Sequence, residues 1–128
     1  MRALLDTHAF LWSLLDDERL SARARSLLDD ARNDVFFSAA SAFEIALKFA
    51  KGRLELPEPP EVLIPSRLAS FAYEALPITV DHAVRAAQLP PIHTDPWDRL
   101  LVAQAQIESL PILSADSVVG QYDVVTIW

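Results

Sequence analysis

The sequence predicts an α/β fold with a central, mostly parallel sheet and helices on both faces. Short, unbroken apolar segments of strand length alternate with longer segments in which apolar residues recur at helical spacing. Strands that are buried on both faces have such continuous apolar runs, and parallel strands need helical crossovers between them. With 128 residues, 52% of them hydrophobic and 23% charged, the chain is expected to form one domain over residues 1–128.

The first half of the chain predicts strands at short apolar runs and helices between them. A strand at residues 2–5 stops at Asp6, because polar residues follow there and apolar residues at 9–15 then take helical spacing. Ser21 opens a second helix, and residues 35–37 form a β-branched and aromatic strand. Ser41 and Glu44 have capping-box spacing at the start of a third helix, which Gly52 ends. Residues 54–56 are expected to be a strand stub.

The second half continues the alternation between helices and strands. Several prolines at 57–60 make a stiff turn before a helix over residues 61–72. The remaining expected elements are a strand at 74–77, a helix at 80–89, a break at 90–91, a helix from about 96 that ends before 111, a strand at 112–113, a turn at 114–116, a short helical piece ending at 121 and a strand at 124–127.

Scarce residue types exclude several classes of chemistry. The chain has only two glycines, Gly52 and Gly120, so it cannot form a glycine-rich nucleotide loop. It has no cysteine, which excludes thiolate metal sites and cysteine nucleophiles, and no serine lies in a Gly-x-Ser-x-Gly motif. The net charge of −7 has the wrong sign for holding nucleic acid by bulk electrostatics. Carboxylates remain as the groups for catalysis.

No segment approaches the roughly 20 uncharged apolar residues that a membrane helix needs. The apolar opening of the chain contains Asp6 and His8 and lacks a small-residue cleavage site at a suitable distance, unlike a signal peptide. We therefore expect a cytoplasmic protein that does not associate with membranes.

Acidic residues are expected around one edge of the sheet, because right-handed crossovers place all strand-to-helix turns there. Two of them follow predicted strands, one lies in the first turns of the third helix, and one opens the helix that precedes the strand at 112–113. These residues are Asp6, Glu44, Asp98 and Asp116, with Asp95 nearby. Each also has an interpretation as a helix cap or a favourable helix-dipole charge. Together, however, partly buried carboxylates need a matching positive charge, and few lysines or arginines are near. A divalent ion such as Mg²⁺ or Mn²⁺ suits all-oxygen ligands.

Four sequence blocks, in this order and spacing, resemble those of PIN-domain nucleases, and most of all the VapC-type toxins of toxin-antitoxin pairs. The blocks are Leu-Leu-Asp-Thr-His at 4–8, Ser-Ala-Ala-Ser-Ala-Phe-Glu-Ile-Ala-Leu-Lys at 38–48, His-Thr-Asp-Pro-Trp-Asp-Arg-Leu-Leu-Val-Ala-Gln-Ala at 93–105 and Leu-Ser-Ala-Asp at 113–116. The resemblance covers nearly the whole chain, and its specificity comes from the four blocks together.

The resemblance implies a three-layer PIN-like domain that acts as a Mg²⁺-dependent endoribonuclease, with Mn²⁺ as an alternative ion. Asp6, Glu44, Asp98 and Asp116 match the family's metal-binding and catalytic acids, and Asp6 and Asp98 are expected to carry most of the metal binding. The ion would activate a water that attacks the RNA backbone and leaves a 5′-phosphate and a 3′-hydroxyl. A cognate antitoxin protein and a homodimer are the other expected partners.

Two alternatives remain: a non-catalytic PIN-fold interaction module, and an RNA-processing nuclease outside any toxin-antitoxin pair. Phospho-acceptor receivers and aspartyl-phosphate hydrolases do not fit, because they need a second acid near Asp6 where His8 stands, and receivers also need a late lysine. His8 and His93 are interpreted as hydrogen-bonded turn residues, and Trp12 and Trp97 as packing residues. The cations near the acids that are candidates for contact with the RNA backbone are Lys48, Lys51, Arg53 and Arg99.

Overall fold

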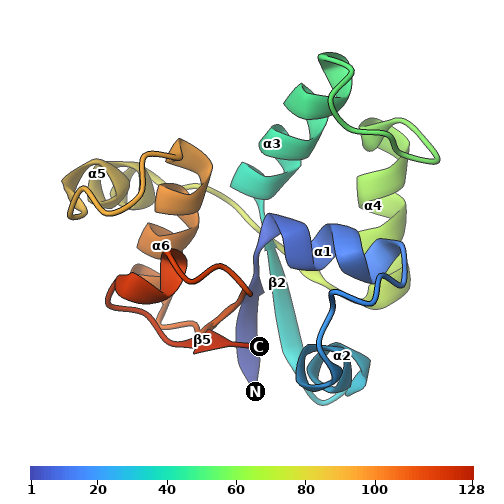
Figure 1. The fold of residues 1–128 in the computed structure, drawn as a ribbon, viewed down its shortest axis with the longest axis horizontal. Coiled ribbons are helices and arrows are strands. Elements are labelled where there is room, and N and C mark those ends of the chain that lie inside the picture. The colour runs from blue at the N-terminus through green and yellow to red at the C-terminus, as the bar shows by residue number, and fades with distance from the viewer.

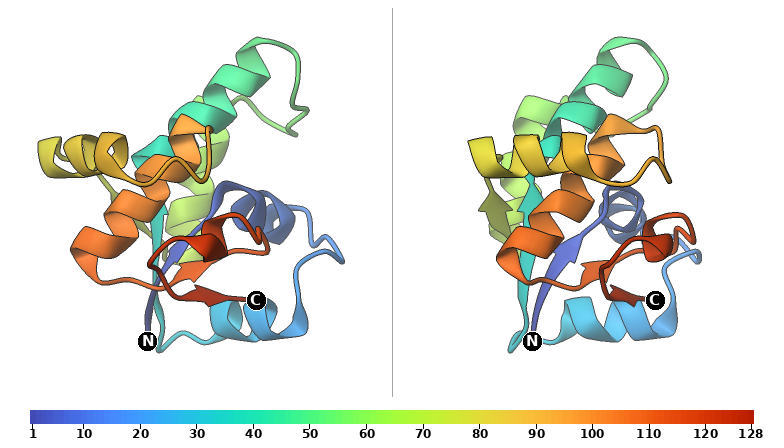
Figure 2. Two further views of the ribbon diagram at one scale, coloured as in Figure 1. Left: turned by 60° about the vertical axis from the view of Figure 1, so that its left-hand side comes forward. Right: turned by 90° about the vertical axis from the view of Figure 1, so that its left-hand side faces the viewer.

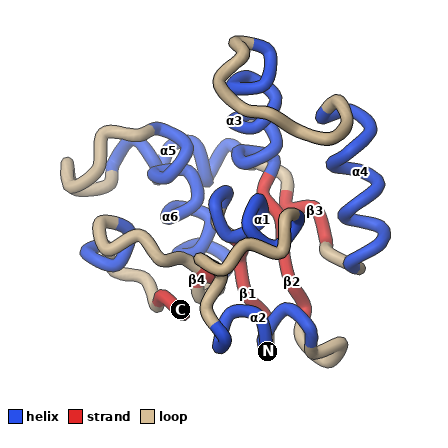
Figure 3. Tube along the Cα trace, turned by 45° about the vertical axis from the view of Figure 1, so that its right-hand side comes forward, coloured by secondary structure: helices blue, strands red, loops and turns tan.

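The computed structural model describes residues 1–128 and has a five-stranded sheet in the order β3-β2-β1-β4-β5, with all neighbouring strands parallel. The strands are β1 (Arg2–Leu5), β2 (Asp34–Ser38), β3 (Glu74–Leu76), β4 (Ile112–Leu113) and β5 (Thr126–Ile127). Figure 3 shows β1 to β4 side by side. The predicted α/β class is confirmed, and the sheet is entirely parallel.

The helices cover both faces of this sheet. They are α1 (Thr7–Leu14), α2 (Ala22–Asp29), α3 (Ala39–Ala50), α4 (Pro60–Phe71), α5 (Val80–Gln88) and α6 (Pro96–Glu108), with a short 3₁₀ helix, η1 (Val119–Gln121). Helices α5 and α6 lie to one side of β1 and β2, and α1, α2 and α4 lie to the other (Figure 1). Helix α3 starts at the carboxyl end of β2 and projects beyond the sheet (Figure 2).

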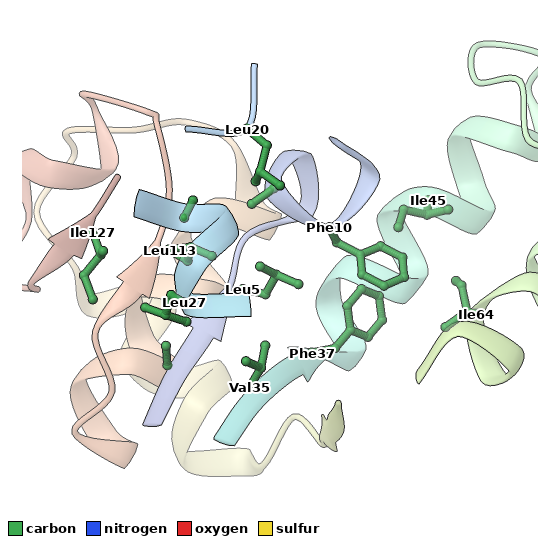
Figure 4. Close-up of a cluster of buried hydrophobic side chains, with 13 residues drawn as sticks. Leu5, Phe10, Leu20, Leu27, Val35, Phe37, Ile45, Ile64, Leu113 and Ile127 are labelled. Carbon is green, nitrogen blue, oxygen red and sulfur yellow. The ribbon is translucent and has the colours of Figure 1, made fainter. Parts of the chain in front are cut away.

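Alternating strand residues supply two hydrophobic cores, one on each face of the sheet. Leu5 and Phe37 point into the core that α1, α2 and α4 cover, where the Phe37 ring packs 4.3 Å from that of Phe10 (Figure 4). Their neighbours Leu4 and Ile112 point into the opposite core, which α5 and α6 cover. This period of two explains why the strands are apolar without interruption.

The strand order places a topological switch point between β1 and β4. The chain adds β2 and β3 on one side of β1 and then crosses to add β4 and β5 on the other. In open parallel sheets, ligands bind at such a point, outside the carboxyl ends of the strands. Asp6 directly follows β1, and Asp116 comes shortly after β4.

Two local predictions are wrong. Ser41 does not cap α3: the helix starts at Ala39, and the Ser38 hydroxyl caps it by accepting a hydrogen bond from the Ala40 amide. Ser41 and Glu44 therefore lie inside the helix and form no capping box. Residues 54–56 form no strand, and the side chains of Leu54 and Leu56 instead pack against the core that α1, α2 and α4 cover.

One further predicted boundary is confirmed, and another is displaced. Gly52 ends the region after α3 with a φ of 69°, a left-handed conformation that glycine adopts without strain. The last strand is shorter than predicted, covering only Thr126–Ile127. None of the helices combines the length and apolar character required to span a bilayer.

Candidate active site

Asp6 lies in the turn between β1 and α1, where it caps the helix and is almost fully buried. Its Oδ1 accepts a hydrogen bond from the Ala9 amide at 2.7 Å, and the residue is 7% exposed. Burial raises the pKa of the Asp6 carboxyl, the Ser114 hydroxyl and the Ala9 amide oppose that rise, and the nearby Asp116 charge adds to it. The helix-cap interpretation is thus correct, and Asp116 lies close enough to interact with Asp6.

Asp98 is held in the first turn of α6 by its neighbour Asp95. The Asp95 side chain caps this helix, accepting hydrogen bonds from the amides of Trp97 at 2.9 Å and Asp98 at 3.2 Å. The side chain of Asp98 therefore does not cap the helix. Burial raises the pKa of Asp98 to about 7, the charges of Asp95, Glu44 and Asp116 add to the rise, and His93 opposes it.

Glu44 is presented from the second turn of α3 and is 3% exposed. Its Oε2 lies 2.6 Å from Nζ of Lys48, one helical turn further on. Lys48 thus neutralises part of the acidic charge, and its Nζ also lies 6.0 Å from the centre of the Trp97 ring. Glu44 lies close enough to Asp98 that its charge contributes to the raised pKa of Asp98.

The structure brings two of the four predicted acids into a tight cluster, together with a histidine. Potential ligand atoms of His93, Asp98 and Asp116 all lie within 4.8 Å of one another. Asp6 and Glu44 lie outside this cluster, and their charges act on Asp116 and Asp98 respectively. The acids therefore gather at one edge of the sheet, as the sequence predicts, around a centre on α6 and the turn after β4.

His93 is the site residue for which sequence reasoning assigned no role. Its Nε2 lies 2.9 Å from Asp98 Oδ2 and 3.6 Å from Asp116 Oδ2. It is hydrogen-bonded in a turn, as predicted, because its Nδ1 accepts from the Asp95 amide at 3.3 Å. The only signal in the sequence is that His93 comes five residues before Asp98, in the same block.

A groove between α1 and α3 continues from the acidic site. It is lined by Thr7, His8, Leu11, Trp12, Leu15, Arg19, Glu44, Ile45, Lys48, Arg53 and Leu54. The hydroxyl of Thr7, one of the lining residues, donates a hydrogen bond to Ser41 Oγ on α3 at 2.9 Å. Of the cations in this groove, Arg19 pairs with Asp17 and Lys48 with Glu44, whereas Arg53 makes no ion pair.

Arg99 does not belong with these cations. Its Nη2 donates hydrogen bonds to the carbonyls of Ala86 and Leu89, at the end of α5. The prediction that Arg99 contacts RNA is therefore wrong, because its guanidinium is hydrogen-bonded to backbone carbonyls at the end of α5 and in the loop that follows. Both tryptophans pack, as predicted: the Trp12 ring lies 5.6 Å from that of Trp128, and the Trp97 ring packs edge to face against Phe43.

Comparison with known protein families decides the classification. A family model described as "PIN domain" matches residues 3–125. The chain belongs to the PIN domain family. In this PIN domain, the four acids singled out from the sequence lie on β1, α3, α6 and the turn after β4, or directly beside these elements.

Individual relatives share parts of the sequence or the whole fold. The PIN domain is 41% identical over 69 residues to ribonuclease VapC16 of Mycobacterium tuberculosis, a match that covers 51% of this chain and 48% of that protein. The chain thus spans about half the length of the curated relative it matches. Its fold is similar to VapBC2 from Rickettsia felis bound to a promoter DNA fragment, with a TM-score of 0.71, 11% identity and coverage of 99% and 98% of the two chains. A toxin-antitoxin complex from Klebsiella pneumoniae matches with a TM-score of 0.65, 18% identity and coverage of 98% and 96%.

The donor set suits a hard divalent cation. Asp6, Glu44 and Asp98 are mostly buried, yet Lys48 is the only lysine or arginine that pairs with any of them. Two carboxylates about 4 Å apart repel by roughly 4 kcal/mol at an effective dielectric near 20. Carboxylate oxygens are the ligands that Mg²⁺ and Mn²⁺ prefer, so a bound ion would relieve this repulsion.

Proposed function

We propose that this PIN domain is a Mg²⁺-dependent endoribonuclease and the toxin of a toxin-antitoxin pair. The observation that carries the proposal is the gathering of buried and half-buried acids at the switch point of the sheet, where burial raises the pKa of Asp98 to about 7 and the charges of neighbouring acids add to that rise. Strongly shifted pKa values of this kind are typical of functional sites, where grouped acids bind a positively charged ligand. The similarity to ribonuclease VapC16 supports RNA as the substrate.

Asp6, Glu44, Asp98 and Asp116 are the residues proposed to hold the ion, with Asp6 and Asp98 contributing most. When bound, Mg²⁺ supplies positive charge that polarises a phosphate and promotes attack by water, and Mn²⁺ can take its place. The chain's own groups fix the geometry: the Ala9 amide holds Asp6, and the Asp95 cap fixes the first turn of α6 beneath Asp98. Cleavage is proposed to leave a 5′-phosphate and a 3′-hydroxyl.

The groove between α1 and α3 is proposed to receive the RNA strand beside the acids. Arg19, Lys48 and Arg53 line it, and their charge can meet phosphates locally although the chain as a whole carries −7. Of the cations predicted to contact RNA, Lys48 and Arg53 line this groove and Lys51 does not, while Arg19 lines it without having been predicted.

A cognate antitoxin is the proposed protein partner, supported by the fold shared with the Klebsiella pneumoniae toxin-antitoxin complex. A homodimer in the cytoplasm is the proposed state of the free toxin. Large apolar side chains that are open to water are consistent with such contacts; among them, Val80 is 80% exposed and Phe43 61%.

Cleavage of a mixed RNA pool tests the proposal. Wild-type protein and the Asp98→Asn variant are incubated with RNA, with and without Mg²⁺, and the new ends are mapped. We expect wild-type cleavage only with Mg²⁺, with 5′-phosphate ends, and a loss of roughly 100-fold or more in Asp98→Asn. Asp123→Asn is the matched control, because Asp123 is exposed and lies beside Gln106 near the C-terminal end of α6, whereas Asp98 is in the first turn of that helix.

Three outcomes would contradict all or part of the proposal. Full activity of Asp98→Asn would show that the cleavage comes from elsewhere. Absence of cleavage, together with tight binding of a partner protein, would favour the alternative of a non-catalytic interaction module. Cleavage by a protein whose gene has no adjacent antitoxin gene would favour an RNA-processing nuclease.

A further inference from the structure

We propose that Arg19, together with the neighbouring Trp12 and His8 rings, forms a subsite for a nucleotide next to the bond that is cleaved. This inference rests on the proposed function, because it assigns part of the RNA strand to a second hollow beside the acids. The hollow lies between α1 and the turn after β4 and has a volume of about 320 Å³. Its lining residues are Asp6, His8, Trp12, Arg19, Ala115 and Asp116.

The hollow and the groove between α1 and α3 share one wall. His8, Trp12 and Arg19 line both of them. Two of the acids proposed to hold the metal ion line the hollow, and a third lines the groove. A strand that lies in the groove can therefore continue into the hollow across these three side chains, with the acids beside it on both sides of the wall.

Arg19 is held in place at several points, although its side chain is 66% exposed. Its Nε and Nη2 donate to the two carboxylate oxygens of Asp17 at 3.1 and 2.8 Å, and its Cζ lies 5.0 Å from the centre of the Trp12 ring. Trp12 in turn packs against Trp128. The remaining nitrogen of the guanidinium, Nη1, has no hydrogen-bond or ion-pair partner. An arginine that is fixed in this way loses little side-chain entropy when its free N–H group binds a phosphate oxygen.

A second arginine shows that the ion pair alone does not mark a subsite. Arg32 pairs with Asp30 through the same two atoms, Nε and Nη2, at 3.0 and 2.8 Å. Its side chain is 89% exposed, however, and it lines neither the groove nor the hollow. Arg19 differs because it lies over Trp12 and beside the acids, where it is the only lysine or arginine that lines the hollow.

The His8 ring provides a surface on which a base can stack. His8 is exposed in the first turn of α1, and its ring centre lies 5.8 Å from that of Trp12. Proteins that bind single-stranded RNA stack its bases on aromatic and histidine rings and use positively charged side chains to bind its phosphates. The hollow offers both kinds of contact. Only Trp12 and Ala115 among its lining residues are apolar, so its chemistry favours an RNA strand over the apolar face of a partner helix.

The experiment measures kcat and KM on one RNA that the wild-type protein cleaves. Arg19→Ala removes the guanidinium, Arg19→Lys keeps the charge without the planar fork, and His8→Ala removes the ring. Arg32→Ala is the matched control, because it breaks the same kind of exposed ion pair away from the hollow. A series of RNAs that each carry one neutral methylphosphonate near the cleaved bond then removes the phosphate charges one at a time.

We expect Arg19→Ala to raise KM by about 3- to 10-fold and to change kcat by less than about 2-fold, because the contact is made equally in the ground state and the transition state. Arg19→Lys should recover only part of this loss. His8→Ala should raise KM by about 5-fold or more, as the loss of one stacked base does. Arg32→Ala should match the wild type.

The modified RNAs identify the phosphate that Arg19 contacts. At one position, the methylphosphonate should raise the wild-type KM by as much as Arg19→Ala does. On that RNA, Arg19→Ala should cause no further loss, because two changes that remove the same contact are not additive. At the other positions, the two effects should add.

Three results would overturn the inference and leave the proposed function standing. An unchanged KM in Arg19→Ala would show that Arg19 does not contact the RNA. Additive losses at every methylphosphonate position would show that Arg19 acts through the fold and not through a phosphate. Wild-type kinetics in Arg19→Ala together with a changed oligomeric state in analytical ultracentrifugation would make the hollow a contact between protein chains. A wild-type protein that cleaves no RNA would instead refute the proposed function and the inference with it.

Discussion

Replacing Asp98 by asparagine is expected to stabilise the metal-free protein while removing its activity. Asparagine keeps the size of the side chain and an oxygen for the contact with His93, but removes the charge that Asp95, Glu44 and Asp116 repel. Because the pKa of Asp98 rises from 3.8 to about 7 on folding, the gain in the free energy of unfolding on removing this charge has an upper limit of about 4 kcal/mol at alkaline pH. Because the Asp98 side chain is 22% exposed, solvent screening reduces the expected gain to about 1–2 kcal/mol.

The sign of the effect follows from proton linkage. The folded protein keeps a proton on Asp98 up to about pH 7, whereas the unfolded chain releases it near pH 3.8. The wild-type protein therefore carries no penalty from Asp98 below about pH 4, and the Asp98 charge progressively lowers its free energy of unfolding as the pH rises from there through 7. The advantage of Asp98→Asn should be largest at pH 8 and vanish near pH 4.

Thermal unfolding in EDTA at several pH values, with Asp123→Asn as the control, measures this difference. At pH 8 we expect Asp98→Asn to melt about 4–8 °C above the wild type. Saturating Mg²⁺ should raise the melting temperature of the wild type but not of the variant, because ligand binding stabilises only the state that binds it. A variant that melts at or below the wild-type temperature at pH 8 in EDTA would refute the electrostatic argument.

Three further substitutions test the contacts that hold α5 and α6. His82→Ala should cost about 2–4 kcal/mol in urea unfolding, because the buried ring caps α5 with Thr79 and contacts Glu108 at 2.9 Å; a cost below about 1 kcal/mol would contradict this. Ser109→Gly should raise stability by up to about 1 kcal/mol, because Ser109 ends α6 with a φ of 55°; a loss would show that its side chain matters more. Arg99→Lys should lower stability by about 1–2 kcal/mol, because lysine cannot donate to all the carbonyls that Arg99 reaches; equal melting curves would argue against that role.

The strands and most helices could be predicted because their signals are local. The run at β1 is apolar on both faces, and Asp95 followed by Pro96 marks the start of α6 without ambiguity. The capping box at Ser41 failed because spacing alone cannot tell a helix start from a helix interior. Ser38 takes the cap, since β2 ends there and the chain turns immediately into α3.

The site could be predicted in its acids but not in the contacts that organise them. Carboxylates after parallel strands must meet at one edge, so the positions of Asp6 and Asp116 followed from the topology, whereas Asp98 was assigned to this edge from its place at the start of α6 and from the family resemblance. The bond between the Asp95 amide and His93, and the approach of His93 to Asp116, depend on how the loop after α5 folds onto the turn after β4. Likewise, Arg99 pairs with backbone carbonyls whose positions no sequence pattern shows.

Anomalous diffraction from a crystal soaked in Mn²⁺ would test most directly whether these acids form a metal centre. The account predicts one strong peak with carboxylate oxygens of Asp6 and Asp98 within about 2.5 Å, and with Glu44 and Asp116 beside it. It predicts no such peak in Asp98→Asn. A well-ordered crystal without a peak at this edge of the sheet, or with Mn²⁺ bound only elsewhere, would contradict it.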